Sequence, residues 1–350
     1  MAMHPLIGHH QARRRLASSF KSGRLPQVIL VTGPLGIGKQ RLGLWLGQLL
    51  LCEQPGEEPC GSCRACRRVL ELSHPDLHWF VPIPRPKAGD SDKQVEEAAE
   101  LLGEALAARR EQPLYQPADG MASHPLASAK LLLRRTVLTP VEGARKVFVL
   151  GEAERLVPQE SSPDAANALL KLLEEPPADT WIVLTTTEPE RVLPTIRSRA
   201  VPLRLTRLPD AELRSFAETM LRPAPGAAQL ETMVQAAHGA IGALASGGER
   251  AAKSGQEARA LLDTVKASRV SRFERSLKQA PWSARGGFTE LLDALALELG
   301  ARVKQNPAQE DTGRLTTALE RVQAAREAAQ GNVNPQLLLA TLTRELAEVL

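Results

Sequence analysis

The sequence predicts an α/β domain with a parallel sheet flanked by helices, followed by domains made only of helices. Short strand-like runs at residues 28–31, 146–150 and 181–184 alternate with helical segments, as in parallel sheets whose strands are buried on both faces. After residue 209 such runs cease. Only 3% of the residues are aromatic, whereas Leu, Ala and Arg are plentiful, and this balance favours helices over a β-sandwich.

The N-terminal elements lead into a glycine-rich loop. We expect a helix over residues 8–22 that Gly23 ends, and then the buried strand at 28–31. Residues 33–39 fit the pattern Gly-x-x-x-x-Gly-Lys, and a helix follows from residue 40 to about residue 51. A strand, a glycine-rich loop and a helix in this order are typical of nucleotide-binding folds.

The later elements extend the same sheet. Between the strands at 146–150 and 181–184, a helix is expected to begin near the N-cap Ser162 and to end before Pro176. This alternation predicts a doubly wound sheet whose functional residues gather at the carboxyl ends of its strands. Residues 82–125, which have Pro- and Gly-rich ends and a helical middle at 93–110, are expected to form a surface excursion outside the sheet.

Charge and hydropathy narrow the class of protein. The formal net charge is +4, and Lys and Arg are interspersed with Asp and Glu, which permits a nucleic-acid neighbour but does not demonstrate one, since a mixed solvated surface is the simpler interpretation. No run of eighteen apolar residues and no secretion signal is present. We therefore expect a cytoplasmic protein that does not span a membrane.

The loop that contains Gly33, Gly36, Gly38 and Lys39 predicts a phosphate-binding fold. In such loops, backbone N–H groups surround the phosphates at a helix N-terminus, and the lysine contacts the β and γ oxygens. For Lys39 two interpretations remain open, which are phosphate binding and mere preservation of the loop.

The residues that would hold magnesium are missing. Gln40 stands where a Ser or Thr hydroxyl usually binds Mg²⁺, and Gly151 stands where an Asp is expected after the strand at 146–150. Two losses at one metal site argue against efficient phosphoryl transfer by this chain. Glu152 occupies the position of a water-activating carboxylate, although an exposed loop acid is the simpler interpretation.

Four cysteines lie within fifteen residues, with the spacing C-x₇-C-x₂-C-x₂-C. Four thiolates complete a tetrahedral zinc shell and leave no position for a reacting water, so we expect a structural zinc site formed by Cys52, Cys60, Cys63 and Cys66. Unligated thiols and an iron–sulfur cluster are the alternatives. His74 and His78 follow, and we expect them to be turn and surface residues, not ligands.

Several segments resemble the AAA+ subunits of bacterial sliding-clamp loaders. Ser198-Arg199-Ala200 is similar to that family's Ser-Arg-Cys segment, and residues 166–177, 185–189 and 196–199 follow its order and spacing. Residues 23–26 and 331–339 also fit. The resemblance covers roughly the first 240 residues except 82–125. In two departures, Ala200 replaces the usual Cys, and residues 239–243 lack the arginine with which members sense their own nucleotide.

This resemblance implies the domain organisation. An AAA+ domain with a phosphate loop would cover residues 1–207, with a zinc module at about 52–66 and an insertion at about 82–125. A small helical lid domain would follow at 208–247, and a C-terminal helical collar for oligomerisation at 248–350.

The resemblance also implies a function, that of a delta-prime-type subunit in a hetero-pentamer with gamma/tau and delta subunits. In such loaders ATP and Mg²⁺ lie at subunit seams, so Arg199 would act in trans on the neighbouring subunit's ATP. Its structural alternative is a salt bridge at the end of a strand or a helix. Thr186 and Thr187 would be remnants of a polar sensor, or else turn residues. The sliding clamp and primer-template DNA would be met through the complex.

Two other functions compete with this one. An ATP-hydrolysing motor of the gamma/tau type would need the magnesium ligands that Gln40 and Gly151 replace. An independent zinc-dependent DNA-binding protein would need an interleaved basic and aromatic patch near the cysteines, which the sequence lacks.

Overall fold

Five strands form one parallel sheet in the computed structural model, which describes residues 3–112, 114, 122–157, 163–221, 225–246, 249–279, 285–305, 312–329 and 333–350. The strands are β1 (Val28–Thr32), β2 (Leu77–Phe80), β3 (Lys146–Leu150), β4 (Thr180–Thr186) and β5 (Val201–Arg204). Their order is β2-β3-β4-β1-β5, and every pair is parallel. β1 therefore lies inside the sheet, where Leu30 is in register with Leu184 of β4 and Pro202 of β5.

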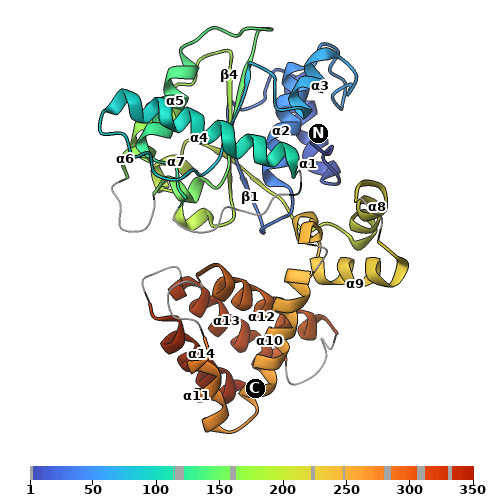
Figure 1. Ribbon diagram of the computed structural model, residues 1–350. Helices are drawn as coiled ribbons and strands as arrows, with labels where there is room; N and C mark the ends of the chain where they lie inside the picture. Colours follow the sequence, from blue (N-terminus) through green and yellow to red (C-terminus); the bar gives the residue numbers. More distant parts are fainter. Residues whose placement is uncertain are drawn as a thin grey trace. The chain divides into compact units, whose positions relative to one another are not determined.

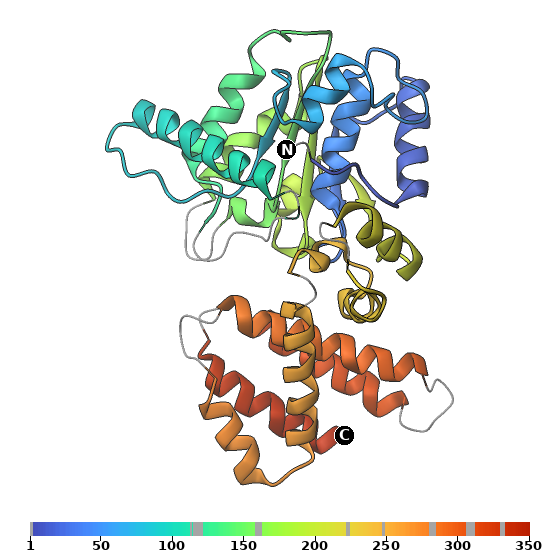
Figure 2. The same ribbon diagram turned by 45° about the vertical axis from the view of Figure 1, so that its right-hand side comes forward.

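The chain divides into two compact units, of which the first consists of Met1–Leu230 and Gly239–Ala245. In this unit α2 and α3 lie on one side of the sheet, and α5 and α6 lie on the other (Figures 1 and 2). Its helices are α1 (His10–Lys21), α2 (Lys39–Leu51), α3 (Arg64–Leu70), α4 (Ser91–Glu111), α5 (Leu126–Thr136), α6 (Asp164–Glu174), α7 (Pro194–Arg197) and α8 (Asp210–Met220), with 3-10 turns η1 (Ala153–Leu156) and η2 (Pro189–Arg191).

Two glycines set the distance between α2 and the sheet. A Cβ atom at Gly43 would lie 2.8 Å from Val149 Cγ1, and one at Gly47 would lie 2.6 Å from Leu77 Cδ1. Because neither glycine has a side chain, α2 packs directly on the buried strands, and its first residue lies at their carboxyl ends. This packing positions the loop that precedes α2.

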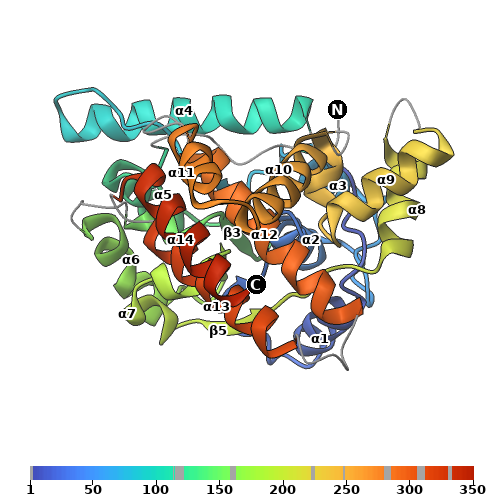
Figure 3. The ribbon, with the colours of Figure 1, turned by 90° about the horizontal axis from the view of Figure 1, so that it is seen from below.

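The second unit consists of Glu231–His238 and Ser246–Leu350 and is helical throughout its described residues. Figure 3 shows its helices from below, and leucines of α10, α12 and α14, among them Leu261, Leu295 and Leu339, form its buried core. The elements are α10 (Glu249–Val265), α11 (Arg269–Leu277), α12 (Arg285–Gln305), α13 (Thr312–Ala329) and α14 (Pro335–Val349), while α9 (Ala227–Ala237) and η3 (Ile241–Ser246) include residues of both units.

The structure confirms the predicted fold class, a parallel sheet flanked by helices and followed by helical segments. It adds β2 and β5, which the sequence did not indicate, whereas the predicted N-cap Ser162 lies outside the described residues. The division at 207 and 247 stays a prediction. Among the described helices, none has both the length and the apolarity that a membrane crossing requires.

The described residues of 82–125 lie outside the five-stranded sheet, as expected, but several of them are buried, so the segment is more than a surface excursion. Ile83 is fully buried, and its backbone forms an antiparallel bridge with Ser123. The long helix α4 lies between these ends, and one of its residues, Arg109, is only 6% exposed. The periodicity of 93–110 predicted the helix correctly, but it did not indicate what the helix packs against.

Candidate functional site

The phosphate loop, residues 33–38, joins β1 to α2 at the carboxyl end of the sheet. Gly33, Gly36 and Gly38 have φ angles of 149°, 74° and 99°, which residues with a Cβ atom rarely adopt. A Cβ atom at Gly33 would also lie 2.6 Å from the carbonyl oxygen of Leu205. The loop therefore requires its glycines, while phosphate binding by them stays a prediction.

The side chain of Lys39 is folded back onto this loop. Its ammonium donates hydrogen bonds to the carbonyl oxygens of Gly33 (2.8 Å) and Pro34 (2.7 Å), and the residue is only 8% exposed. Burial lowers the pKa of Lys39 to about 8, although the charges of Glu154 and Glu152 act to raise it. Lys39 thus has protein acceptors in this structure, and a phosphate would have to replace them.

The two positions that should bind magnesium face each other, but they hold no metal ligands. A Cβ atom at Gly151 would lie 2.4 Å from Oε1 of Gln40, so the amide of Gln40 fills the space that an aspartate would need. That oxygen accepts hydrogen bonds from Trp79 Nε1 (3.0 Å) and Arg109 Nη1 (3.1 Å). An oxygen that already accepts two N–H groups does not suit a divalent cation, and these residues do not fit a magnesium site.

The carboxylates beside the loop are buried, not exposed. The side chain of Glu152 is 13% exposed and pairs with Arg155 at 2.8 Å, so its interpretation as an exposed loop acid is wrong. Burial raises the pKa of Glu152, while the charge of Arg155 acts to lower it. Within the described residues, Oε1 of Glu152 has no hydrogen-bond partner.

The predicted sensor residues lie at the end of β4 and make local contacts. Thr186 is fully buried, and its hydroxyl accepts a hydrogen bond from the backbone N–H of Glu188 (3.0 Å), as in a turn. Thr187 Oγ1 donates to Glu154 Oε1 (2.9 Å). These contacts agree with the turn interpretation, and the sensor role stays a prediction.

The segment that lacks the sensing arginine lies directly on the phosphate loop. The backbone N–H of Gly242 donates to the carbonyl oxygen of Gly36 (2.8 Å). A Cβ atom at Gly242 would lie 2.9 Å from the Cα of Gly36, which leaves no room for a side chain there. A side chain at Gly242 would therefore clash with the backbone of the phosphate loop.

Arg199 follows α7 and is distant in sequence from the phosphate loop of its own chain. The contacts of its side chain are made with other segments. Its guanidinium pairs with Glu174 at the end of α6 (3.0 Å) and donates to the carbonyl oxygen of Thr195 (3.0 Å). The side chain is 30% exposed, and that of Glu174 is 60% exposed. The salt bridge expected of a purely structural arginine is thus present. The side chain is also partly exposed, so a neighbouring molecule can reach it.

The four cysteines come together between α2 and α3. Their sulfur atoms all lie within 4.8 Å of one another, and Cys60 Sγ and Cys66 Sγ are 3.9 Å apart. A zinc ion bound at about 2.3 Å to four sulfurs requires sulfur–sulfur distances of about 3.8 Å, so the cluster fits zinc. Backbone N–H groups of Cys63 and Ser62 donate to Cys60 and lower the pKa of its thiol to about 6, which favours the thiolate that binds metal.

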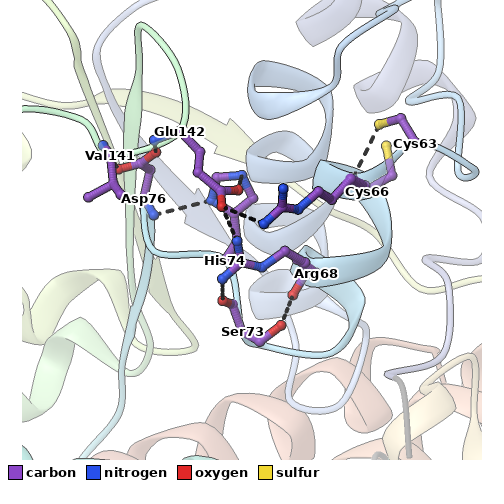
Figure 4. A network of polar contacts seen from close by, with 9 residues as sticks. Cys63, Cys66, Arg68, Ser73, His74, Asp76, Val141 and Glu142 are labelled. Carbon is purple, nitrogen blue, oxygen red and sulfur yellow. Dashed lines mark hydrogen bonds and ion pairs between the residues drawn. The ribbon is translucent and has the colours of Figure 1, made fainter.

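A polar network connects this cluster to the sheet (Figure 4). Arg64 and Arg68 of α3 pair with Glu142, in the loop before β3. Asp76, just before β2, accepts the backbone N–H groups of Val141 (2.6 Å) and Glu142 (2.8 Å). The cysteine module is therefore fastened to the edge of the sheet formed by β2 and β3.

The histidines beyond the cysteines belong to this buried region, so the expectation of surface residues is wrong. His74 is 5% exposed and accepts the backbone N–H of Asp76 on Nδ1 (3.1 Å). Burial lowers the pKa of His78 to about 4. Among the described residues, the only cluster with metal-ligand geometry consists of the four cysteines. That neither histidine is a ligand stays a prediction.

The sequence did not reveal Trp79, Arg109 and His124 as residues of this region. Trp79 lies on β2, which was not predicted, and Arg109 and Gln40 are too far apart in the chain for a spacing argument. Arg109 did carry one signal. It lies on the buried face of α4, seven residues after Leu102, where a solvated arginine is not expected.

His124 gives a pH-dependent prediction. Its Nε2 donates to the carbonyl oxygen of Gly151 (2.7 Å), and burial lowers its pKa from 6.5 to about 4. The imidazole of His124 therefore binds a proton more tightly in the unfolded chain than in the folded one. As a result, the free energy of unfolding has its full value above pH 6.5 and declines as the pH falls to 4, by about 3 kcal/mol for this residue. We expect His124→Gln, which keeps a donor but does not titrate, to show a flatter profile in urea unfolding across this range. Parallel profiles for both proteins would contradict the assignment.

Comparisons with known proteins point to one family. A family model described as "DNA polymerase III, delta subunit" matches residues 8–209. The DNA polymerase III subunit delta' of Escherichia coli (strain K12) is 34% identical over 186 residues, which is 53% of this chain and 44% of that protein. That of Bacillus subtilis (strain 168) is 32% identical over 188 residues, 54% of this chain and 44% of that protein.

More distant similarities extend beyond this subunit type. The DNA polymerase III subunit gamma/tau of Mycobacterium bovis is 30% identical over 214 residues, 60% of this chain and 30% of that protein. The matches span less than half the length of each of these relatives. A solved structure of a DNA polymerase III gamma subunit-related protein from Thermotoga maritima covers 98% of this chain and 99% of its own, with a TM-score of 0.41 and 14% identity.

Proposed function

We propose, from the premise that this chain belongs to the DNA polymerase III delta-subunit family, that it is the delta-prime-type subunit of a bacterial sliding-clamp loader. In this proposal it is a stator that does not hydrolyse ATP itself. It helps to load the sliding clamp onto primer-template DNA as part of a hetero-pentamer with gamma/tau and delta subunits, in the cytoplasm.

The observation that carries this proposal is the replacement of both magnesium ligands. Gln40 and Gly151 bring an amide and a bare backbone to the place where a hydroxyl and a carboxylate would be needed. Phosphoryl transfer depends on positioned positive charge at the transferred group, and Mg²⁺ supplies much of it. A chain that keeps the loop but cannot hold this ion retains the architecture of an ATPase without its chemistry.

Arg199 is the residue that we propose for catalysis, in trans. A guanidinium keeps its charge at all physiological pH values and presents a planar fork to phosphate oxygens. In the free chain this fork is held by Glu174 and Thr195 at the exposed end of α6. We propose that it contacts the γ-phosphate of ATP bound to the adjacent subunit. The zinc ion proposed for Cys52, Cys60, Cys63 and Cys66 is structural.

The test is an assay on the purified chain alone. We expect no Mg²⁺-dependent release of phosphate from ATP, since no ligand pair holds the metal. The same preparation, mixed with the other loader subunits, should be required for clamp loading onto primed DNA. Mg²⁺-dependent turnover by the lone chain would favour the gamma/tau motor function instead. Salt-dependent DNA binding by the lone chain that needs its cysteines would favour an independent zinc-dependent DNA-binding protein.

A further inference from the structure

The side chain of Gln40 is the meeting point of three segments that are distant in the chain. Its amide oxygen accepts one hydrogen bond from Trp79 of β2 and one from Arg109 of α4, at 3.0 and 3.1 Å. The guanidinium of Arg109 also lies over the Trp79 ring, 4.7 Å from its centroid. The same oxygen lies 2.4 Å from the position that a Cβ atom of Gly151 would take. A permanent cation thus stands next to the atom that occupies the lost magnesium site.

We propose that Arg109 takes the place of the divalent cation in this chain, and that Arg109, Trp79 and Gln40 form a latch that attaches α4 to the first turn of α2, directly after the phosphate loop, and closes the metal side of that loop. We call these three residues the α4 latch. The inference rests on the proposed non-hydrolysing function, and it names the residues that keep the loop inactive. It also gives residues 82–125 a role.

The charges around the loop support the replacement. Glu152 is largely buried beside the loop, where a metal ion would otherwise neutralise carboxylates. The positive charges that lower the pKa of Glu152 against the effect of burial are those of Arg155, Arg109 and Lys39. Arg109 therefore contributes, from an insertion, part of the positive charge that magnesium supplies in an ATPase. Unlike a bound ion, it cannot dissociate or be removed by a chelator.

The helix that carries Arg109 is built to present it. The buried residues of α4 are Val95, Ala98, Leu102 and Arg109, which lie on one helical face. The first three are apolar and pack in the core of the unit, and Arg109 continues their line for two more turns. Its neighbour Arg110 is exposed. The burial of one arginine and not the next indicates a specific contact and not a general basic surface.

The opposite side of the loop is closed independently. The backbone of Gly242 packs on Gly36 so closely that no side chain fits between them. Lys39 is engaged by the carbonyl oxygens of Gly33 and Pro34. The phosphate loop and the first turn of α2 thus make intramolecular contacts on two sides. Residues 239–245 pack on the loop, and α4 is attached at Gln40.

The latch can be tested by hydrogen exchange on the full chain. We expect Arg109→Ala and Gln40→Ala each to raise amide exchange in residues 102–111 by about tenfold or more, since a charge-assisted hydrogen bond and a stacked contact are lost. Arg110→Ala is the matched control and should leave exchange unchanged. Arg109→Lys keeps the charge but not the fork, so it should restore protection only in part. The double variant should exchange no faster than the single variants, because both changes break the same contact.

Two results would overturn the latch. In the first, the amides of residues 102–111 exchange at the same rate in Arg109→Ala as in Arg110→Ala, while both variants melt at the wild-type temperature. The other is faster exchange in residues 102–111 of the wild-type chain when ATP and Mg²⁺ are added, since that would make α4 a lid displaced by nucleotide. If Arg109→Ala instead unfolds the chain, amide exchange in Arg109→Lys and Gln40→Ala tests the latch in its place. The role of Arg199 in the assembled loader is measured separately, so failure of the latch and failure of the proposed function are distinguishable.

Discussion

Arg199→Ala should sharply lower the clamp- and DNA-stimulated ATPase activity of a reconstituted loader while leaving the subunit folded and able to assemble. Arginine fingers accelerate hydrolysis by about 10³–10⁵-fold, so we expect a loss of about 10³-fold or more at the ATP site that Arg199 faces. Single-turnover phosphate release by the complex measures this loss. The isolated variant should lose less than about 1 kcal/mol of stability, because its ion pair with Glu174 is partly exposed.

A neighbouring arginine provides the control for this experiment. Arg197 lies two residues earlier and pairs with the exposed Glu190 at 2.7 Å, so Arg197→Ala removes a similar charge without removing the proposed finger. Arg199→Lys separates charge from geometry, since lysine cannot present two parallel N–H groups. A complex in which Arg199→Ala hydrolyses ATP as fast as Arg197→Ala would exclude the role in trans.

Loss of the proposed zinc site should be the most damaging change to the structure. We expect the double variant Cys60→Ser/Cys66→Ser to lose its zinc, and its cysteine module to be cleaved readily by proteases between residues 52 and 66. Zinc binding is worth about 10–16 kcal/mol in isolated zinc-finger peptides, and whole domains have stabilities of only about 5–15 kcal/mol. Metal analysis and limited proteolysis measure the two effects.

Ser62→Ala is the matched control, because its hydroxyl lies 3.8 Å from the sulfur of Cys60 but is not part of the four-sulfur cluster. It should retain zinc and resist proteolysis like the wild-type chain. Wild-type protein that is purified without zinc and remains equally resistant and stable would contradict a structural metal.

Local patterns predicted the parts of the site that are continuous in the chain. The glycines at 33, 36 and 38 have positive φ angles, as expected of such a loop, and the four cysteines at the predicted spacing form one cluster of sulfurs. Both depend on short-range geometry, which spacing encodes. The edge strand β5 escaped prediction because three of its four residues are exposed and it lacks an apolar run.

The contacts that decide the chemistry of the loop were not predictable in this way. Gln40 was predicted to replace a metal ligand, but its hydrogen-bond partners come from β2 and from α4, whose positions depend on the order of the strands. Gly242 and Gly36 meet for the same reason. Tertiary packing determines which distant residues meet, and a single sequence does not contain that information in any local pattern.

The central position of β1 also affects how the protein is made. This strand leaves the ribosome before both of its neighbours, β4 and β5, which are translated only after Asp179. Nascent domains fold as units, and pairing between distant segments is slow. The apolar first strand is therefore exposed for much of translation, and we expect the newly synthesised chain to depend on chaperones until Arg204 has emerged.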